Sequence, residues 1–319
     1  MSEDGRVPSG RCGEKIRAWV KIARLQFYPM TWIAYSMGAA VVFCTRQKFS
    51  LPAYLAGYLV LFFIELSTIL TNEYYDYPTD RLNQNAGPFT GGTRVLVEGK
   101  LGFQEVRTGI FLSLGLVVSS AILLVQVSRD VSPFAILVLV LLGLFLGLGY
   151  TCPPLKFSYR GLAEVTVGLT HSPYVILCGY LFQGGSVNDS LPWLISIPLF
   201  FAVLAAITLA GIPDRRADQE VSKRVFAVLW GAREAAILAA FFACVAVISG
   251  VMLWYARIIQ GNPAIIIFAG IPHCLLLLAF LFKLIRSDHY DRKINGIMAL
   301  ALSYIIWFGL IPLISFLGC

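Results

Sequence analysis

The sequence carries little charge for its length. Of its 319 residues, 13% are Asp, Glu, Lys or Arg and three are His, whereas a soluble chain usually has about 25% charged residues. This scarcity excludes an intrinsically disordered protein, a nucleic-acid-binding protein with a large hydrated surface and an ordinary soluble enzyme. The chain is instead 58% hydrophobic with a mean hydropathy of +0.75. A lipid bilayer is the solvent that suits this composition.

Paired cysteines are also lacking. The seven Cys residues form no CxxC motif, and most of them lie in hydrophobic stretches, where a thiol behaves as a small apolar group. We therefore expect neither a disulfide framework nor a zinc site. No change in composition marks a second domain, so residues 1–319 are expected to form one membrane domain, with 1–15 as a flexible cytoplasmic tail.

Long hydrophobic runs, in contrast, are abundant. Nine of them have roughly the 20 residues that a transmembrane helix needs: 18–44, 51–71, 108–127, 133–150, 162–182, 191–212, 235–255, 264–285 and 294–316. Two connections between them are long, at 72–107 and 213–234, and long loops are usually functional. The expected fold class is an all-α, polytopic, integral membrane protein with nine transmembrane helices.

The basic residues are distributed unevenly between the two sides of these spans. The N-terminal segment and the even-numbered loops hold 21 of the 25 Lys and Arg residues, and the other side holds 4. The positive-inside rule then places the N-terminus and both long connections in the cytoplasm. The net charge of +7 is thus read as a topology signal, and no nucleic-acid partner is expected.

Two acidic motifs stand at the predicted cytoplasmic ends of two spans. Each has a spacing of four residues, which puts its members on one helix face: Asn72, Asp76 and Asp80 in the first, Asp214 and Asp218 in the second. Like charges at this spacing repel each other, and acidic residues at a helix C-terminus oppose the helix dipole. A bound cation relieves both effects, and Mg²⁺ commonly binds carboxylates together with substrate phosphates. For either motif taken alone, the alternative to a cation site is that its residues are ordinary polar residues at a helix end.

Basic residues follow or flank these motifs. Lys156 and Arg160 follow the fourth span, Arg94 ends a Gly-Gly-Thr-Arg segment, and Lys223 and Arg224 follow the second motif. Each residue taken alone also fits the positive-inside rule. Together they fit a polyanion, because Lys and Arg neutralise phosphate oxygens. Acidic pairs, basic residues and a membrane fold indicate a Mg²⁺-diphosphate carried by a lipid-like molecule.

Polar residues inside the predicted spans are further candidates. Glu65 lies about two helical turns before Asn72, and an ionisable group at that depth is either functional or a structural hydrogen-bonding residue. Arg24 and Gln26 could line a cavity, and Arg24 could equally extend to the membrane surface. His171 is read as structural.

These motifs make the sequence resemble the UbiA superfamily of intramembrane aromatic prenyltransferases. The family's NxxxDxxxD and DxxxD motifs match the two acidic motifs, and its Tyr-x-x-Pro-Pro-x-Lys segment matches residues 150–156. Residues 87–96, GPFTGGTRVL, look most like the branch that contains the 1,4-dihydroxy-2-naphthoate prenyltransferases of menaquinone synthesis. One departure is Ser222, which precedes Lys223 where many members have Gly.

The resemblance implies a helix bundle around a central cavity, under a cytoplasmic cap made by the two long loops. It implies Mg²⁺ as cofactor, with these ligands: Asn72, Asp76, Asp80, Asp214 and Asp218. It assigns the diphosphate to Lys156, Arg94, Lys223, Arg160 and Arg224. Tyr150 would lie beside the allylic carbon, a carboxylate of the first motif would accept the ring proton, and Arg24, Gln26 and Glu65 would belong to the acceptor or prenyl pocket.

Alternative functions remain open at this point. The enzyme would transfer a prenyl group from a polyprenyl diphosphate to an aromatic acceptor such as 1,4-dihydroxy-2-naphthoate or 4-hydroxybenzoate. A terpene cyclase on the same scaffold would use the same ionisation residues without an acceptor. A transporter is disfavoured, because its ionisable residues would lie near the bilayer midplane and not at one interface. The prenyl length and the oligomeric state cannot be read from the sequence.

Overall fold

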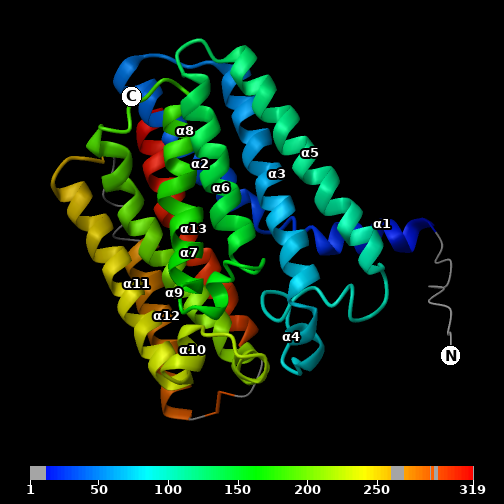
Figure 1. Ribbon diagram of the computed structural model, residues 1–319. Coiled ribbons are helices and arrows are strands. Elements are labelled where there is room, and N and C mark those ends of the chain that lie inside the picture. Colours follow the sequence, from blue (N-terminus) through cyan, green and yellow to red (C-terminus); the bar gives the residue numbers. More distant parts are fainter. Residues whose placement is uncertain (1–11, 260–268, 288, 291–293, 319) are drawn as a thin grey trace.

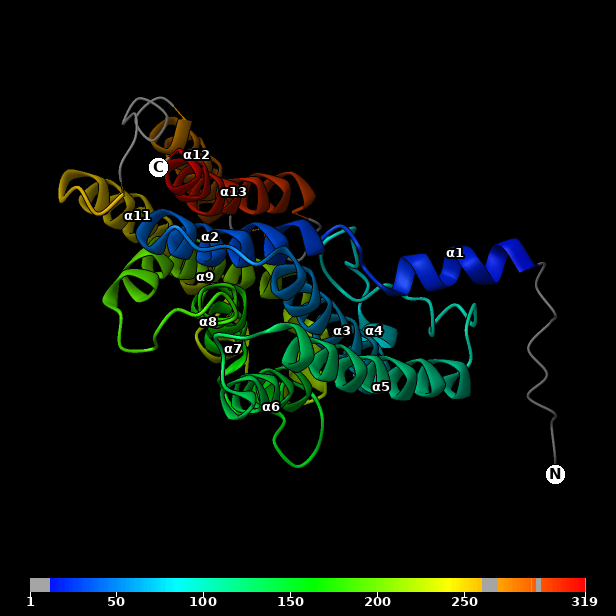
Figure 2. The same cartoon turned by 90° about the horizontal axis from the view of Figure 1, so that it is seen from above.

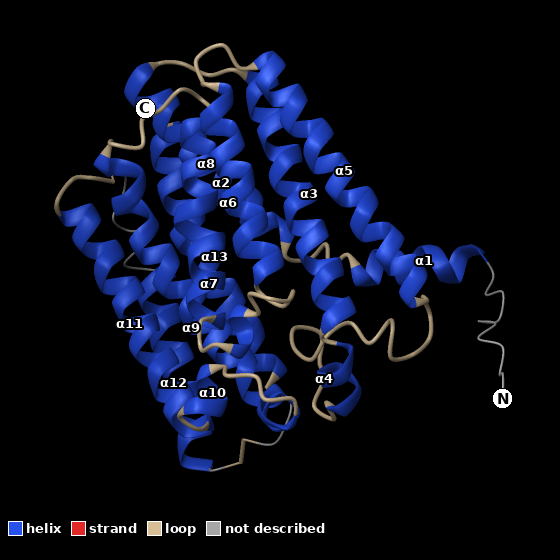
Figure 3. Ribbon diagram, in the orientation of Figure 1, coloured by secondary structure: helices blue, strands red, loops and turns tan. Residues whose placement is uncertain are grey.

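The computed structural model describes residues 12–259, 269–287, 289–290 and 294–318, and all regular structure in these ranges is helical (Figure 3). Six of the described helices are long and apolar enough to cross a membrane: α2 (Tyr28–Arg46), α3 (Leu51–Tyr75), α5 (Phe103–Val127), α9 (Ser190–Glu220), α11 (Ala232–Tyr255) and α13 (Asn295–Leu317). They run roughly along one common direction in the bundle (Figure 1). The predicted all-α class is confirmed.

The remaining predicted spans are shorter or interrupted. Residues 133–150 correspond to α6 (Pro133–Gly149), and 162–182 to α7 (Ala163–Leu169), the π-helical segment η2 (Thr170–Tyr174) and α8 (Val175–Leu181). Span 264–285 overlaps α12 (Ile271–Ser287), while its residues 264–268 lie outside the described part. The described residues therefore support six long spans, and the count of nine is not confirmed.

The first predicted span, 18–44, is wrong in its boundaries. The structure has two helices there, α1 (Cys12–Ile22) and α2, separated by Arg24, whose φ of 50° is left-handed. Such a residue cannot continue a right-handed helix. Figures 1 and 2 show that α1 lies crosswise to the long helices, beside the start of α5, and projects sideways from the bundle. Residues 12–15 of the predicted tail begin α1, and residues 1–11 lie outside the described part.

The two long connections are partly helical. After α3, the short helix α4 (Tyr77–Leu82) precedes a loop that runs to α5. The second connection was expected to begin at residue 213, but α9 continues through Pro213 to Glu220, followed by α10 (Phe226–Leu229). The second acidic motif therefore lies on a regular helix, which keeps both of its carboxylates on one face.

Small residues allow the helices to pack closely. The face of α11 that packs on the bundle is fully buried and carries alanines at Ala235, Ala236, Ala239, Ala243 and Ala246. A Cβ added at Gly38 of α2 would overlap with the carbonyl of Ile176. Small residues at helix contacts are typical of membrane proteins. Large apolar side chains such as Phe111, Phe134 and Met252 are instead exposed on the outside, as a lipid-facing surface requires.

One cysteine differs from the expectation. Cys44, near the end of α2, is disulfide-bonded, whereas Cys152, Cys178, Cys244 and Cys274 are free. The expectation of no disulfide is therefore corrected at Cys44. The described residues contain no group of three or more His, Cys, Asp or Glu that could hold a metal ion by themselves, a zinc site included.

Candidate active site

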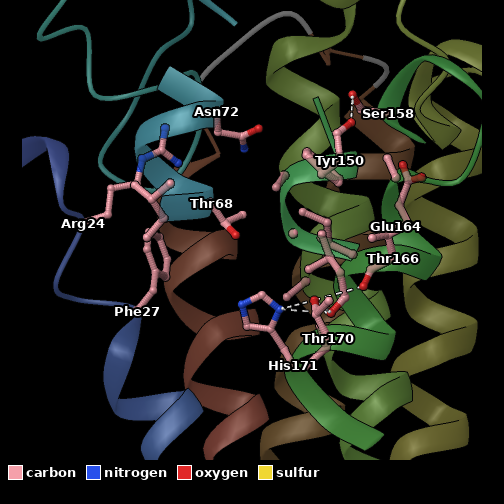
Figure 4. A pocket seen from close by; sticks show the side chains of 18 of the residues that line it. Arg24, Phe27, Thr68, Asn72, Tyr150, Ser158, Glu164, Thr166, Thr170 and His171 are labelled. Carbon is pink, nitrogen blue, oxygen red and sulfur yellow. Dashed lines mark hydrogen bonds between the residues drawn. The ribbon is translucent and has the colours of Figure 1, made fainter. Parts of the chain in front are cut away.

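A cavity of about 360 Å³ lies between α2, α3, α6, α7, α9 and α13, within the size range of small-molecule sites. Its lining follows α3 from Leu61 to Asp76, so it is mostly apolar along the bundle, with Glu65 and Thr68 as polar exceptions, and acidic at the end where α3 stops. Figure 4 shows part of this lining. The cavity brings together most of the predicted site residues: Arg24, Glu65, Asn72, Asp76, Asp80, Tyr150, Asp214, Asp218 and Lys223.

The first motif is arranged by the end of α3. Asp76 caps α3 and its carbonyl accepts a hydrogen bond from the backbone N–H of Asp80 at 2.9 Å, in the first turn of α4. Asn72, Asp76 and Asp80 thereby all face the cavity. Burial, together with Glu73 and Asp76, raises the pKa of the Asp80 carboxyl to about 8, against the opposing effect of Arg24.

Lys223 joins the two acidic motifs. Its Nζ lies 2.9 Å from Oδ2 of Asp76 and 3.7 Å from Oδ1 of Asp218. Its backbone N–H donates to the Asp218 carbonyl at 2.9 Å, and Ser222 adopts a left-handed φ of 62° in this turn. Burial opposes the charge on Lys223, but Asp76 and Asp218 outweigh it and hold its pKa above the usual value.

The Ser222 conformation explains the departure noted in the sequence. A left-handed residue is a position that glycine favours, and Ser222 takes this conformation without glycine. The turn geometry is therefore kept, and the lysine that follows still reaches the first motif.

Asp214 is held by the loop that follows α4. Its Oδ1 accepts from Nδ2 of Asn83 at 2.7 Å, and its Oδ2 accepts from the backbone N–H of Gly91 at 3.0 Å. Gly91 has a φ of 75°, so the loop turns its amide towards α9. Asn83 carries no signal in the sequence beyond its place three residues after Asp80, and sequence reasoning missed it.

Glu73 is a second residue that sequence reasoning missed. Its buried carboxylate accepts from Nε of Arg24 at 3.1 Å, from the backbone N–H of Thr93 at 2.9 Å and from the Thr93 hydroxyl at 2.6 Å. These bonds tie the residues before α2 and the loop after α4 to the end of α3. Its place beside Asn72 in the first motif was the available signal.

Five residues predicted for the site do not line the cavity: Arg94, Lys156, Arg160, Arg224 and Gln26. Arg94 donates to the backbone carbonyls of Asp80 and Asn83 at 3.0 and 3.1 Å, so it supports the loop. Nζ of Lys156 lies 4.7 Å from the centre of the Tyr159 ring, and Nζ of Lys223 lies 5.9 Å from the same ring.

Arg160 donates to the Pro154 carbonyl at 2.9 Å and is exposed. Arg224 and Gln26 are exposed as well. Tyr150 lines the cavity at the end of α6, where its carbonyl accepts from the Ser158 hydroxyl at 2.9 Å (Figure 4).

The acidic end of the cavity suits a hard divalent cation. Oδ1 of Asn72 and Oδ1 of Asp76 are buried without a hydrogen-bond partner, which is rare for buried polar atoms. Amide and carboxylate oxygens are the ligands that Mg²⁺ uses. The remaining carboxylates are supplied by α4 and α9.

Comparison with known proteins assigns the chain to a family. Residues 31–313 match the UbiA prenyltransferase family. The chain belongs to this family. The predicted class of enzyme, a prenyltransferase, is therefore confirmed at the level of the family. The family and the six long apolar helices also support the prediction of an integral membrane protein.

Two curated relatives illustrate the range of UbiA proteins that resemble this one. The 1,4-dihydroxy-2-naphthoate octaprenyltransferase of Bacillus subtilis is 28% identical over 202 residues, which are 61% of each chain. The chloroplastic 2-carboxy-1,4-naphthoquinone phytyltransferase of Arabidopsis thaliana is 26% identical over 192 residues, 59% of this chain and 45% of the relative. The chain thus spans less than two thirds of the length of either relative.

Solved UbiA structures share the fold. The apo structure of a UbiA homologue from Aeropyrum pernix K1 superposes with a TM-score of 0.67 at 19% identity, over 88% of this chain and 95% of the other. A UbiA homologue from Archaeoglobus fulgidus, bound to DMAPP and Mg²⁺, superposes with a TM-score of 0.57 at 17% identity, over 93% and 99% of the two chains.

Proposed function

We propose that the protein catalyses the Mg²⁺-dependent transfer of a prenyl group from a polyprenyl diphosphate to an aromatic acceptor within the membrane, with 1,4-dihydroxy-2-naphthoate as the acceptor. One observation carries this proposal: the two acidic motifs, from α3–α4 and from α9, lie together at one end of a mostly apolar cavity. Such a cavity suits an apolar chain with a charged head at that end.

The reaction breaks the bond between the allylic carbon and a diphosphate oxygen, and the electron pair leaves with the diphosphate. A ring carbon of the acceptor forms the new carbon–carbon bond, and it then loses a proton or a carboxyl group to restore aromaticity. Bound Mg²⁺ would neutralise the diphosphate and so make it a better leaving group.

The protein's residues divide this work between the two ends of the cavity. Asn72 and Asp76 offer unpaired oxygens to the cation, and Asp80, Asp214 and Asp218 supply further carboxylates. Lys223 bridges two of these carboxylates and supplies a positive charge where the leaving group develops negative charge. We propose that four further basic residues also act on the diphosphate, although none of them lines the cavity: Lys156, Arg94, Arg160 and Arg224.

The apolar length of the cavity excludes water from the allylic cation. Tyr150 lines the cavity at its acidic end, where a ring face can stabilise a cation. One relative is named for 1,4-dihydroxy-2-naphthoate and another for 2-carboxy-1,4-naphthoquinone, and both names favour a naphthalene acceptor. The alternatives are 4-hydroxybenzoate as acceptor, and a terpene cyclase that needs none.

We further propose nine membrane crossings with the acidic end of the cavity in the cytoplasm, beneath a cap formed by the two connections. Helices α6 and α12 have 17 described residues each, the lower limit for a crossing, and α7, η2 and α8 together form another. The disulfide at Cys44 supports this orientation, because it lies at the end of α2 away from Arg24, and disulfides persist outside the cytoplasm.

A product screen by mass spectrometry tests the function. Purified protein in lipid is incubated with several prenyl diphosphates, each crossed with 1,4-dihydroxy-2-naphthoate, 4-hydroxybenzoate or no acceptor, with and without Mg²⁺. The proposal expects a prenylated naphthalene product that requires Mg²⁺. A cyclic hydrocarbon formed without any acceptor would establish the cyclase, and substrate flux into vesicles without diphosphate release would establish a transporter.

A further inference from the structure

The cavity contains a second polar group, two helical turns away from the acidic motifs. It consists of Glu65 on α3 and His171 on η2, both of which line the cavity. Seven residues separate Glu65 from Asn72, which is about 10 Å along a helix. The diphosphate chemistry does not use either residue, so their presence at this depth needs its own account.

His171 lies in a local distortion of the backbone. Residues Thr170–Tyr174 form a π-helical turn between α7 and α8, and Pro173 lies within it. Proline cannot donate a backbone hydrogen bond, so a regular helix is interrupted here. Single π-turns within helices are frequent at functional sites. The His171 ring lies in the cavity, on the same face of this stretch as Ala163 and Val167 (Figure 4).

The hydrogen bonds of His171 fix which role its free nitrogen can play. Nδ1 lies 3.1 Å from the Val167 carbonyl and 3.0 Å from the Thr170 hydroxyl. A carbonyl only accepts, so Nδ1 carries the hydrogen and donates it. The neutral ring then leaves Nε2 as an acceptor. Figure 4 shows the bonded nitrogen turned back towards Thr170 and the rest of the ring in the cavity.

Glu65 contributes a second acceptor to the lining of the same cavity. Its Oε2 is buried without a hydrogen-bond partner. Buried side-chain oxygens are nearly always paired, and in a membrane interior no bulk water can satisfy them. An unpaired oxygen that lines a cavity points to a ligand that donates a hydrogen bond.

We propose that His171 and Glu65 are positioning residues that accept hydrogen bonds from ring hydroxyls of the aromatic substrate, and so select a hydroxylated ring over one whose hydroxyl is alkylated or oxidised. This inference rests on the proposed function and names the substrate feature that the cavity reads. A quinone or an ether offers no hydrogen to Nε2, whereas a free hydroxyl offers one. Sites built to bind a hydroxyl reject analogues that lack it strongly.

The test compares 1,4-dihydroxy-2-naphthoate with its two monomethyl ethers, in wild-type protein and in His171→Phe. Phenylalanine keeps an aromatic ring but cannot accept a hydrogen bond. In the wild type we expect kcat/KM to be about tenfold or more lower for at least one ether than for the diol. In His171→Phe the ratio of kcat/KM for the diol to kcat/KM for that ether should fall below about threefold, because only turnover of the diol is slowed. The KM for the prenyl diphosphate should stay within about twofold of the wild-type value.

Two further variants make the test specific. His171→Gln restores an acceptor oxygen and should recover part of the discrimination. His273→Phe is the matched control: this histidine lies on α12, contacts the Leu300 carbonyl and Trp307, and does not line the cavity. In this control the ratio of kcat/KM values between the diol and the ethers should stay as in the wild type. An equal loss of discrimination in His273→Phe would overturn the inference.

Binding of the same three compounds to the wild type is measured by calorimetry without prenyl diphosphate. The inference expects the diol to bind the wild type at least about tenfold more tightly than one ether. Equal binding by the wild type would overturn it, even if His171→Phe did not fold. Failure of the wild type to prenylate any acceptor would instead refute the proposed function. Prenylation with unchanged discrimination in His171→Phe would refute this inference alone.

Discussion

Lys223 Nζ lies 2.9 Å from Oδ2 of Asp76, although 147 positions separate the two residues in the chain. The same ammonium lies 3.7 Å from Oδ1 of Asp218. Lys223 is therefore the counter-charge that allows two acidic motifs to share the end of one cavity. Its side chain and both carboxylates are largely buried, so the pair is weakly screened by solvent.

Lys223→Met should destabilise the protein, because it leaves two buried carboxylates without their common cation. Breaking a buried ion pair by removing one partner costs about 3–5 kcal/mol. Unfolding is followed by denaturant titration in detergent. Millimolar Mg²⁺ should restore more stability to the variant than to the wild type, since the cation takes over the role of the ammonium.

The matched control for Lys223 is Lys48→Met. Lys48 forms an ion pair of 3.9 Å with Asp130 in which both side chains are about two thirds exposed, so its loss should change stability by less than about 0.5 kcal/mol. Equal stability of Lys223→Met and Lys48→Met would show that the Lys223 bridge does not form.

Gly92→Ala should displace Asp80. Gly92 has a φ of 69°, and a Cβ at this position would overlap with the Asp80 carboxylate. A shift of about 1 Å at a catalytic group can cost a hundredfold in rate, so we expect a loss of that order in Mg²⁺-dependent diphosphate release. The release is measured with saturating acceptor.

Gly99→Ala provides the control within the same loop. Gly99 also has a positive φ, 63°, but a Cβ there meets no atom within 4 Å. Both substitutions carry the backbone strain of a left-handed alanine, and only Gly92→Ala reaches the site. Similar activity in the two variants would contradict the position assigned to Asp80.

Glu73→Ala should loosen the loop that follows α4. The side chain of Glu73 is 2% exposed and accepts hydrogen bonds from Arg24 and Thr93. Its removal should therefore lower the free energy of unfolding by about 3 kcal/mol. Limited proteolysis should cut residues 83–102 faster in the variant. Glu98→Ala is the comparison, because Glu98 pairs with Lys100 at a more exposed place and should cost less than about 1 kcal/mol.

Asp76→Asn should greatly slow transfer although the protein still folds, because Lys223 keeps Asp218 as a partner. The amide has nearly the same shape but lacks the charge that a divalent cation requires. We expect diphosphate release to fall by about a hundredfold or more. Chelation of Mg²⁺ should stop the wild-type reaction, and added Mg²⁺ should restore it. Full activity in Asp76→Asn would refute the role given to this motif.

Several features of the fold and the site follow from local properties of the sequence. Hydropathy predicted the class of protein and the positions of most long helices, because burial in lipid depends on the composition of each segment. A spacing of four residues predicted that Asp214 and Asp218 share a helix face, and α9 confirms it. The helical break at Arg24 was missed, since hydropathy continues across it while its φ of 50° ends the helix.

The sequence by itself determined a charge-poor, all-helical membrane chain with acidic motifs at helix ends, because hydrophobicity and helical period act over a few residues. Only the tertiary structure decided which groups meet: Lys223 with Asp76, Asn83 with Asp214, and Glu73 with Thr93. It also turned His171 into the cavity. These contacts arise from the packing of helices that are distant in the chain, and their free energies depend on burial that no local pattern encodes.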